Sequence, residues 1–189
     1  MNRMRIARNF ALMIALATFT AIGVQPDAAL AAGARELEQD ARTALNRLYG
    51  SAPAARSLSK RAKGVLVFPS IVKAGLMIGG QFGEGVLFKN GKAVGFYNTA
   101  GASYGLQAGA QKFGYALFFM NDGALGYLGR SDGFEIGVGP SVVVMDEGMA
   151  KQTSTTTLTQ DVYGFIFGQS GLMAGLGLQG NKITKIDKR

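Results

Sequence analysis

Hydrophobic residues recur at helical spacing in the first part of this chain. From Ala34 to Tyr49 charged residues fall between them, which predicts an amphipathic helix that Gly50 ends. Ser51 and Pro53 are typical of the cap and first turn of a second short helix that reaches about Ala62. We therefore expect the fold to begin with two helices.

After these helices the pattern changes to short apolar runs of the kind that form β-strands. The first run, Gly64 to Phe68, is followed by Pro69, which is expected to end it. The link Lys89-Asn90-Gly91-Lys92 places Asn-Gly between two apolar runs, which is the strongest short signal for a hairpin. No long helix alternates with the runs, so we expect mostly antiparallel pairing. The predicted strands are 64–68, 74–83, 84–88, 93–98, 103–109, 114–120, 135–139, 142–145, 162–168, 172–179 and 181–186, with 153–158 as another candidate and a short helix around 124–128.

Glycine is unusually frequent within the predicted strands. The chain has 28 glycines and only 4 prolines, without the period of collagen. In Gly171–Gly180, and similarly in Gly101–Gly109, glycines alternate with larger residues, so one face of each strand would be nearly bare. Glycine inside a strand usually marks sharp bending or close approach of another backbone. The expected fold class is α+β, with N-terminal amphipathic helices followed by a strongly curved, glycine-rich, mostly antiparallel sheet or partly closed barrel.

The first 31 residues have the layout of a secretory signal peptide. Three arginines precede an apolar run from Phe10 to Val24, and Ala29-Leu30-Ala31 forms a small-x-small cleavage site. The run is shorter than the ~20 residues of a membrane-spanning helix, so a retained anchor is the weaker alternative. We expect cleavage of residues 1–31 and a single domain over 32–189, helical at 34–62 and β-rich at 64–187.

The charge balance points to an anionic partner. The formal net charge is +8, and loss of the predicted signal peptide, with three arginines and one aspartate, lowers it to +6. Five basic residues cluster near the start of the β region, beside the apolar Phe68, Ile71 and Val72: Arg56, Lys60, Arg61, Lys63 and Lys73. Such a cluster suits an anionic lipid surface, at about 1 kcal/mol per Lys or Arg. A solvated basic rim is the alternative, and nucleic acid is not expected as a partner of an exported chain.

The composition excludes several kinds of catalysis. The chain has no histidine and no cysteine, which removes histidine-dependent triads, thiol chemistry, disulfides and iron–sulfur clusters. Ser57–Lys60 and Gly175–Gly180 match the S-x-x-K and G-x-G-x-x-G patterns, but neither has the sequence context that its chemistry needs. The acidic pair Asp146-Glu147 fits a solvated turn, and the hydroxyl run Ser154–Thr157 fits an exposed strand face. We expect no enzyme activity, no cofactor and no metal site.

Several long blocks of the chain resemble the SYLF domain, a lipid-binding family shared by bacteria and eukaryotes. The densest block is Ala62–Gly75, and the resemblance covers residues 45–186. The other matching blocks are 79–86, 102–111, 113–119, 135–142, 154–157, 161–168 and 171–180. One departure is Phe134, because the family commonly has tryptophan at that position.

The resemblance implies phospholipid binding. Eukaryotic members bind phosphoinositides, partly through a basic amphipathic N-terminal segment, and some bind actin, which is not an expected partner of an exported chain. Lys63 and Lys73 match positions within the densest block. We therefore expect non-enzymatic binding of anionic phospholipid by a protein that is exported to the periplasm or cell envelope, or secreted. A small outer-membrane β-barrel and a structural or assembly protein of the envelope are the alternatives, and the oligomeric state is open.

Overall fold

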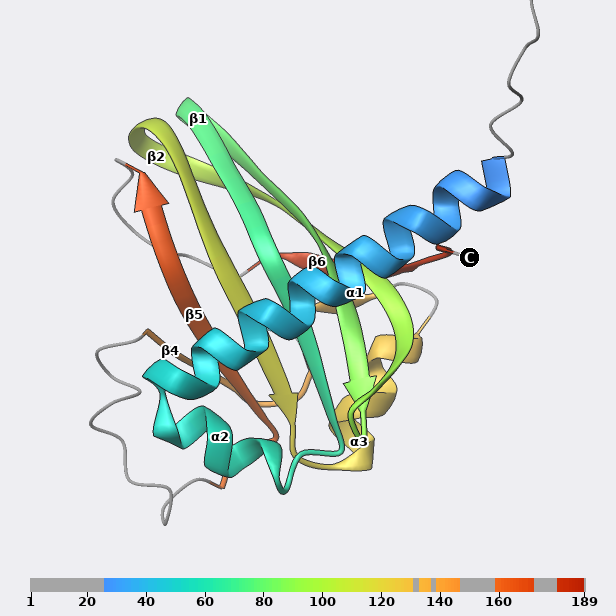
Figure 1. The fold of residues 1–189 in the computed structure, drawn as a ribbon. Coiled ribbons are helices and arrows are strands. Elements are labelled where there is room, and N and C mark those ends of the chain that lie inside the picture. Colours follow the sequence, from blue (N-terminus) through green and yellow to red (C-terminus); the bar gives the residue numbers. More distant parts are fainter. Residues whose placement is uncertain (1–25, 131–132, 137–138, 147–158, 172–179, 189) are drawn as a thin grey trace, which may run out of the picture.

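A strongly curled β-sheet forms the centre of the molecule, and two helices cover its outer face (Figure 1). The computed structural model describes residues 26–130, 133–136, 139–146, 159–171 and 180–188. The elements in chain order are α1 (Pro26–Ser51), α2 (Pro53–Ser59), β1 (Gly64–Lys89), β2 (Lys92–Phe119), α3 (Asp122–Gly126), the 3-10 helix η1 (Tyr127–Gly129), β3 (Phe134–Glu135), β4 (Val142–Met145), β5 (Val162–Gly171) and β6 (Lys182–Ile186). The expected α+β class with a strongly curved sheet is confirmed.

The apolar spacing predicts both N-terminal helices, but α1 begins at Pro26, eight residues before the predicted start, and the junction of the helices differs in detail. The residue that caps α2 is Ala52, which has an extended backbone, and Pro53 begins the helix. Ser51 instead ends α1, and its hydroxyl donates to the Leu48 carbonyl oxygen at 3.4 Å. The second helix ends at Ser59, shorter than predicted. Residues 1–25, which hold most of the predicted signal peptide, lie outside the described residues.

The longest strands, β1 and β2, form one antiparallel ribbon. Their pairing runs from Lys89 opposite Lys92 to Gly64 opposite Phe119. The turn between them has positive φ at Asn90 and Gly91, at 49° and 74°, as the Asn-Gly prediction requires. The separate short strands predicted here are therefore parts of two long ones.

Pro69 does not end β1, which corrects the sequence prediction. The strand passes through this residue, and its register against β2 shifts between Phe68 and Ile71. A β-bulge at this point lets proline sit in the strand, because the missing backbone N–H is not required by the ladder.

The ribbon folds over on itself near Gly75–Gly79, so the two halves of β1 touch. A β-carbon on Gly83 would lie 2.8 Å from Cγ1 of Ile71, and one on Gly85 would lie 2.6 Å from the carbonyl oxygen of Val67. Only a residue without a side chain permits such an approach between strands. The glycines in this part of the sheet therefore act as predicted, by allowing close approach of another backbone.

The remaining strands extend the sheet from the edge of β2 that β1 leaves free, where β6 pairs with residues 96–100 and β5 with residues 111–119. The order is β3-β6-β2-β5-β4, with β1 also paired to β2. All these pairs are antiparallel except β4 with β5, so the sheet is mixed. The observed β3 is shorter than the strand predicted at 135–139, α3 with η1 accounts for the predicted helix at 124–128, and the strands predicted at 153–158 and 172–179 lie outside the described residues.

Both faces of the sheet carry buried apolar side chains. The outer core lies under α1 and α2 and is formed chiefly by Ala41, Ala44, Leu48, Leu58, Val65, Val67, Val86, Phe88, Ala116, Phe118, Tyr163, Phe165 and Phe167. The inner core lies within the curl against α3 and η1 and is formed chiefly by Leu66, Phe68, Ile71, Leu87, Tyr97, Tyr115, Leu117, Phe119, Leu125, Leu128, Val162, Ile166 and Ile183. Successive residues of one strand alternate between the two cores, as the period of a β-strand requires.

A hydrogen-bonded carboxylate joins three elements at one end of the sheet. Asp161, just before β5, accepts from Nδ2 of Asn121 at 2.7 Å and from the backbone N–H and the hydroxyl of Ser141 at 3.2 and 3.1 Å. Asn121 in turn caps α3, because its Oδ1 accepts from the Ala124 backbone N–H at 2.8 Å. The Asn121 and Ser141 hydrogen bonds hold the pKa of Asp161 below its ordinary value.

The lowered pKa of Asp161 makes the stability of the protein depend on pH. Because the folded-state pKa of Asp161 is lowered, its contribution is present above the ordinary carboxyl pKa of 3.8 and is lost as the pH falls through the folded value. We expect Asp161→Asn to lower the urea midpoint near neutral pH, and the difference from the parent protein to shrink on acidification below that value. Asp40→Asn, an exposed position on α1, is the control. A difference that is constant across the acid range would contradict the assignment.

Candidate functional site

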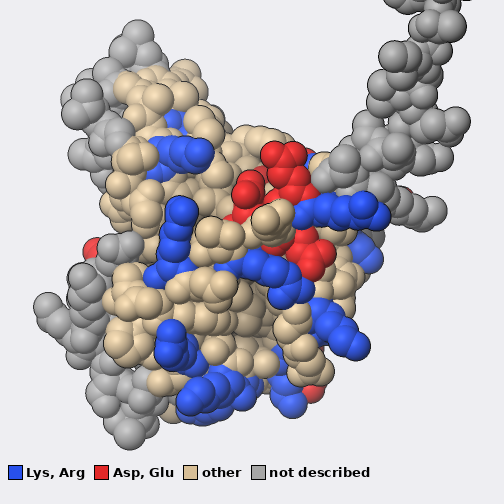
Figure 2. All heavy atoms as spheres, in the orientation of Figure 1, with Lys and Arg blue, Asp and Glu red and all other residues tan. Residues whose placement is uncertain are grey.

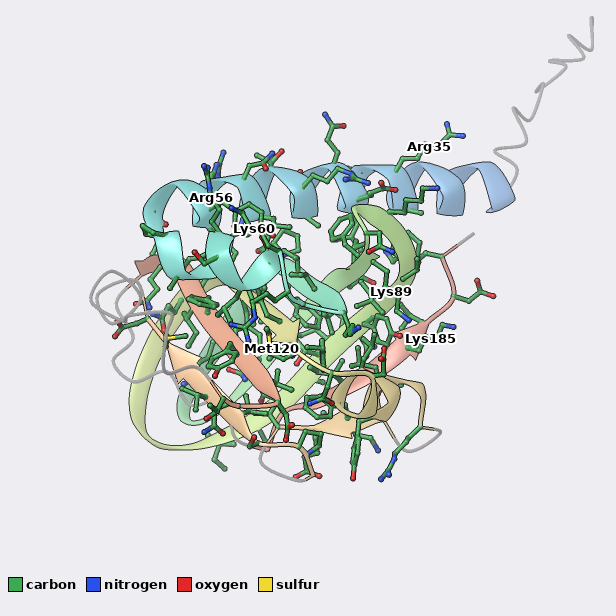
Figure 3. The ribbon with its side chains drawn as sticks, turned by 90° about the horizontal axis from the view of Figure 1, so that it is seen from below. Arg35, Arg56, Lys60, Lys89, Met120 and Lys185 are labelled. Carbon is green, nitrogen blue, oxygen red and sulfur yellow. The ribbon has the colours of Figure 1, made fainter. Side chains whose placement is uncertain are left out.

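Four cationic side chains project from the end of α2 and from the link that follows it. Arg56 lies in the last turn of α2, Lys60 is its C-terminal cap, and Arg61 and Lys63 lie between α2 and β1. All four are exposed (Figure 3 labels Arg56 and Lys60). We call this set, Arg56, Lys60, Arg61 and Lys63, the α2 cations.

The backbone that carries the α2 cations is firmly held. The Arg61 N–H donates to the carbonyl oxygen of buried Leu58 at 3.0 Å, which closes the last turn of α2. The Lys63 N–H donates to the Phe119 carbonyl oxygen at 2.8 Å, which joins the link to the sheet. The cations are thus presented from fixed backbone positions, so binding an anion costs only the ordering of their side chains.

The charge of this set is little compensated within the protein. Lys63 approaches Asp122 at 4.0 Å, but both side chains are exposed, and such a pair contributes little to stability. Among the described residues, none forms a salt bridge with Arg56, Lys60 or Arg61. The local field at the end of α2 is therefore positive and accessible from solvent.

A groove of about 380 Å³ opens beside Lys60, between α1, α2 and the turn of the β1–β2 ribbon. Its lining includes the apolar side chains of Val65 and Phe88, together with Tyr49. Burial raises the pKa of Tyr49, against a smaller opposing effect of its hydrogen bond with Ser59, so the phenol is neutral at physiological pH. The groove thus combines a cation, a neutral hydroxyl and an apolar lining, which suits the headgroup region of an amphiphile.

Arg42 also lines this groove, but its guanidinium is committed to the fold. It pairs with Glu38 at 2.7 Å, donates to the Gly91 carbonyl oxygen at 3.0 Å and lies 4.8 Å from the centre of the Phe88 ring. These contacts tie α1 to the turn of the ribbon. Lys60 is therefore the cation in this groove that is available to a ligand.

A second groove, of about 600 Å³, adds two cations that the sequence does not single out. It lies between α1 and the strands β1, β2 and β5, and exposed Arg47 and Lys112 are part of its lining, with Leu48 and Phe167 as apolar members. The two basic residues are distant in the chain and meet only because α1 lies across the sheet. The sequence holds no local signal for either residue, since Lys112 comes to lie opposite the exposed Val72 only through the register of β1 and β2.

Lys73 does not belong to this surface, which corrects the sequence prediction. Its side chain is 2% exposed and lies on the inner side of the sheet, where β1 pairs it with Gln111. The bulge at Pro69 shifts the alternation of side chains, so Ile71 and Lys73 point inward. Lys73 instead belongs to a set of buried polar residues with Gln81, Thr99, Gln111 and Asn181.

The space-filling view shows how the charges are distributed on the face that carries both helices. Figure 2 shows basic side chains from just below the folded end of the ribbon down to α2, whereas acidic side chains gather near the middle of α1. The α2 cations, Arg47 and Lys112 therefore form the candidate site, a basic face with apolar grooves.

The other motifs that the sequence offers for a reaction or a metal lie at the surface where the structure describes them. Within the described ranges, no group of three or more acidic side chains is placed to hold a metal ion. Ser57 and Lys60 of the S-x-x-K pattern both lie exposed on or beside α2. The patterns at 154–157 and 175–180, and Glu147, lie outside the described residues. No helix of the described part combines the length and the apolar character needed to cross a membrane.

Compared with models of known protein families and with curated protein sequences, the chain matches none. The charge, exposure and groove lining of the basic face therefore carry the functional argument. The sequence blocks described above bear on it only as a resemblance.

Proposed function

We propose that this protein binds anionic phospholipid through the α2 cations, without catalysis. The observation that carries the proposal is the exposure of Arg56, Lys60 and Arg61, which form no salt bridge among the described residues. The resemblance of residues 45–186 to the SYLF domain favours a lipid over other polyanions. The predicted signal peptide favours a membrane of the periplasm or cell envelope, or lipid met after secretion.

The chemistry of the α2 cations suits a phosphate headgroup. An arginine guanidinium binds two phosphate oxygens at once, and a lysine ammonium acts as a compact positive charge. Each contributes about 1 kcal/mol near an anionic membrane surface. The apolar lining of the groove beside Lys60 gives the neighbouring glycerol and acyl carbons a favourable contact. Relatives of the family bind phosphoinositides, and any exposed lipid phosphate presents the same chemistry.

Neutralising three of these cations is expected to weaken binding to anionic vesicles about 100-fold, because three charges at about 1 kcal/mol each are lost. The variant is K60Q/R61Q/K63Q, and the measurement is co-sedimentation with vesicles of phosphatidylcholine and phosphatidylglycerol in equal parts. The control R35Q/R130Q/K185Q removes the same charge from exposed positions away from α2, and Figure 3 shows two of them, Arg35 and Lys185, toward the opposite end of the molecule from Arg56. It is expected to weaken binding much less.

Two results would contradict this proposal. Equal binding of the parent protein to anionic vesicles and to pure phosphatidylcholine would remove the electrostatic basis. Equal loss of binding in both triple variants would show that net charge, rather than the α2 cations, is responsible. Binding should also weaken as ionic strength rises, since salt screens exposed charges.

A further inference from the structure

The folded end of the β1–β2 ribbon exposes large apolar side chains. Ile78 is 66% exposed, Phe82 53% and Val72 51%, although large apolar side chains are usually buried. The chain has no charged residue at 74–83 or at 99–111, the two stretches that meet at this end. Monomeric proteins rarely expose a contiguous uncharged apolar element without a binding role.

Nothing in the described fold covers these three side chains. In Figure 1 the folded end of the ribbon lies at the top of the molecule, whereas α2 and α3 lie at the bottom. The apolar residues of α1 pack against the outer core, whose strand members lie outside the uncharged stretches. The folded end therefore projects from the body that the helices stabilise.

The charges that border this end are cationic or neutralised. Lys112 lies opposite Val72 of β1. Lys182 of β6 lies opposite Ala100 of β2 on one side and opposite Glu135 of β3 on the other. Both lysines are exposed. The acidic residue that borders the 74–83 stretch, Glu84, forms a 2.7 Å salt bridge with Lys188. An apolar end bordered by lysines complements a bilayer, in which acyl chains lie beneath anionic headgroups.

The dimensions also suit a single leaflet. Strand residues rise about 3.3 Å each, so the three steps from Val72 to Gly75, where the ribbon begins to fold over, reach roughly 10 Å. Half of the hydrocarbon layer is about 15 Å thick. Because β1 and β2 pair along both stretches, the backbone polar groups that face each other across this pairing are already hydrogen-bonded, which lowers the cost of leaving water.

From these observations we infer that the folded end of the ribbon inserts among the acyl chains of the membrane. The inference rests on the proposed function, because it concerns the lipid that the α2 cations attract. It adds a second, apolar contact at Val72, Ile78 and Phe82. Figure 2 shows basic side chains between this end and α2, on a face that a membrane can meet along its length. Arg47 and Lys112 line the groove between α1 and the sheet.

The chain has no tryptophan, so a single introduced indole reports its own surroundings. We expect F82W to show a blue-shifted emission with phosphatidylcholine–phosphatidylglycerol vesicles and strong quenching by lipids brominated on their acyl chains. The matched control is V94W, because Val94 is also 50% exposed on the ribbon but lies near the Asn90-Gly91 turn. Its emission is expected to change little.

A second pair of variants separates insertion from electrostatic binding. I78S/F82S is expected to weaken vesicle binding about tenfold and V94S less than twofold, with circular dichroism verifying that each is folded. Protein that co-sediments normally while F82W emission is unchanged would overturn the insertion and leave the proposed function intact. Absence of any vesicle binding by the parent protein would overturn both. A blue shift of F82W that grows with protein concentration without vesicles would assign this end to a second copy of the chain and overturn insertion.

Discussion

Replacing Phe118 by alanine is expected to lower the free energy of unfolding by about 3–5 kcal/mol, the range for emptying a buried aromatic position. Phe118 is fully buried in the outer core. Its ring meets Phe165 edge-on at 5.3 Å between centres and Tyr49 of α1 at 6.4 Å. The substitution thus removes contacts within the sheet and between the sheet and α1.

The control for Phe118→Ala is Phe82→Ala, the same change at an exposed strand position. We expect the control to alter stability by no more than about 0.5 kcal/mol. Urea unfolding followed by circular dichroism measures both. Equal effects of the two substitutions would contradict the placement of Phe118 between α1 and the sheet.

Gly85→Ala is expected to cost about 3 kcal/mol, at the upper end of the range for overpacking. The added β-carbon would lie 2.6 Å from the Val67 carbonyl oxygen and 2.6 Å from Cδ1 of Phe68. The Val67 carbonyl oxygen belongs to the backbone, so rotation of a side chain cannot relieve this clash. The two halves of β1 would have to separate.

Gly126→Ala is the matched control, because a β-carbon there has no atom within 4 Å and the backbone φ is −62°. It is expected to be neutral or stabilising by up to about 1 kcal/mol, since alanine restricts the unfolded chain. The same urea experiment compares the two variants. A cost at Gly85 no greater than at Gly126 would contradict the contact between the halves of β1.

Features with a local physical cause could be predicted from the sequence. The Asn90-Gly91 turn needs two residues that tolerate positive φ, and β4 appears at 142–145 as its apolar run predicts. Helix α1 follows from its apolar spacing. The continuation of β1 through Pro69 could not be predicted, because it depends on a bulge in the register with a partner strand almost fifty residues away.

The position of Lys73 shows how one such bulge alters a functional prediction. Without it, side chains alternate in step from Phe68, and Lys73 would lie on the outer face with Val72 inside. The register shift before Ile71 reverses this order. Four of the five predicted cations remain together because they lie on a short helix and its link, where spacing along the chain sets position in space.

The proximity of Arg47 and Lys112, by contrast, could not be predicted from the sequence. Neither is distinguished by its neighbours in the sequence, and their shared groove exists only because α1 crosses the curled sheet. The exposure of Phe82 is equally hidden, since apolar strand residues are more often buried. The fold class and the grouping of the α2 cations follow from local sequence patterns. The grooves and the projecting end arise only from tertiary packing.

The contact of α1 with both halves of the doubled ribbon has a consequence for the order of folding. Val65 and Val67 come from the first half of β1, Val86 and Phe88 from the second, and all four belong to the core under α1. The surface on which α1 packs therefore does not exist until the β1–β2 hairpin has paired from its turn and folded over. We expect formation of the ribbon to precede docking of α1. The docked helix then stabilises the contact between the two halves of β1.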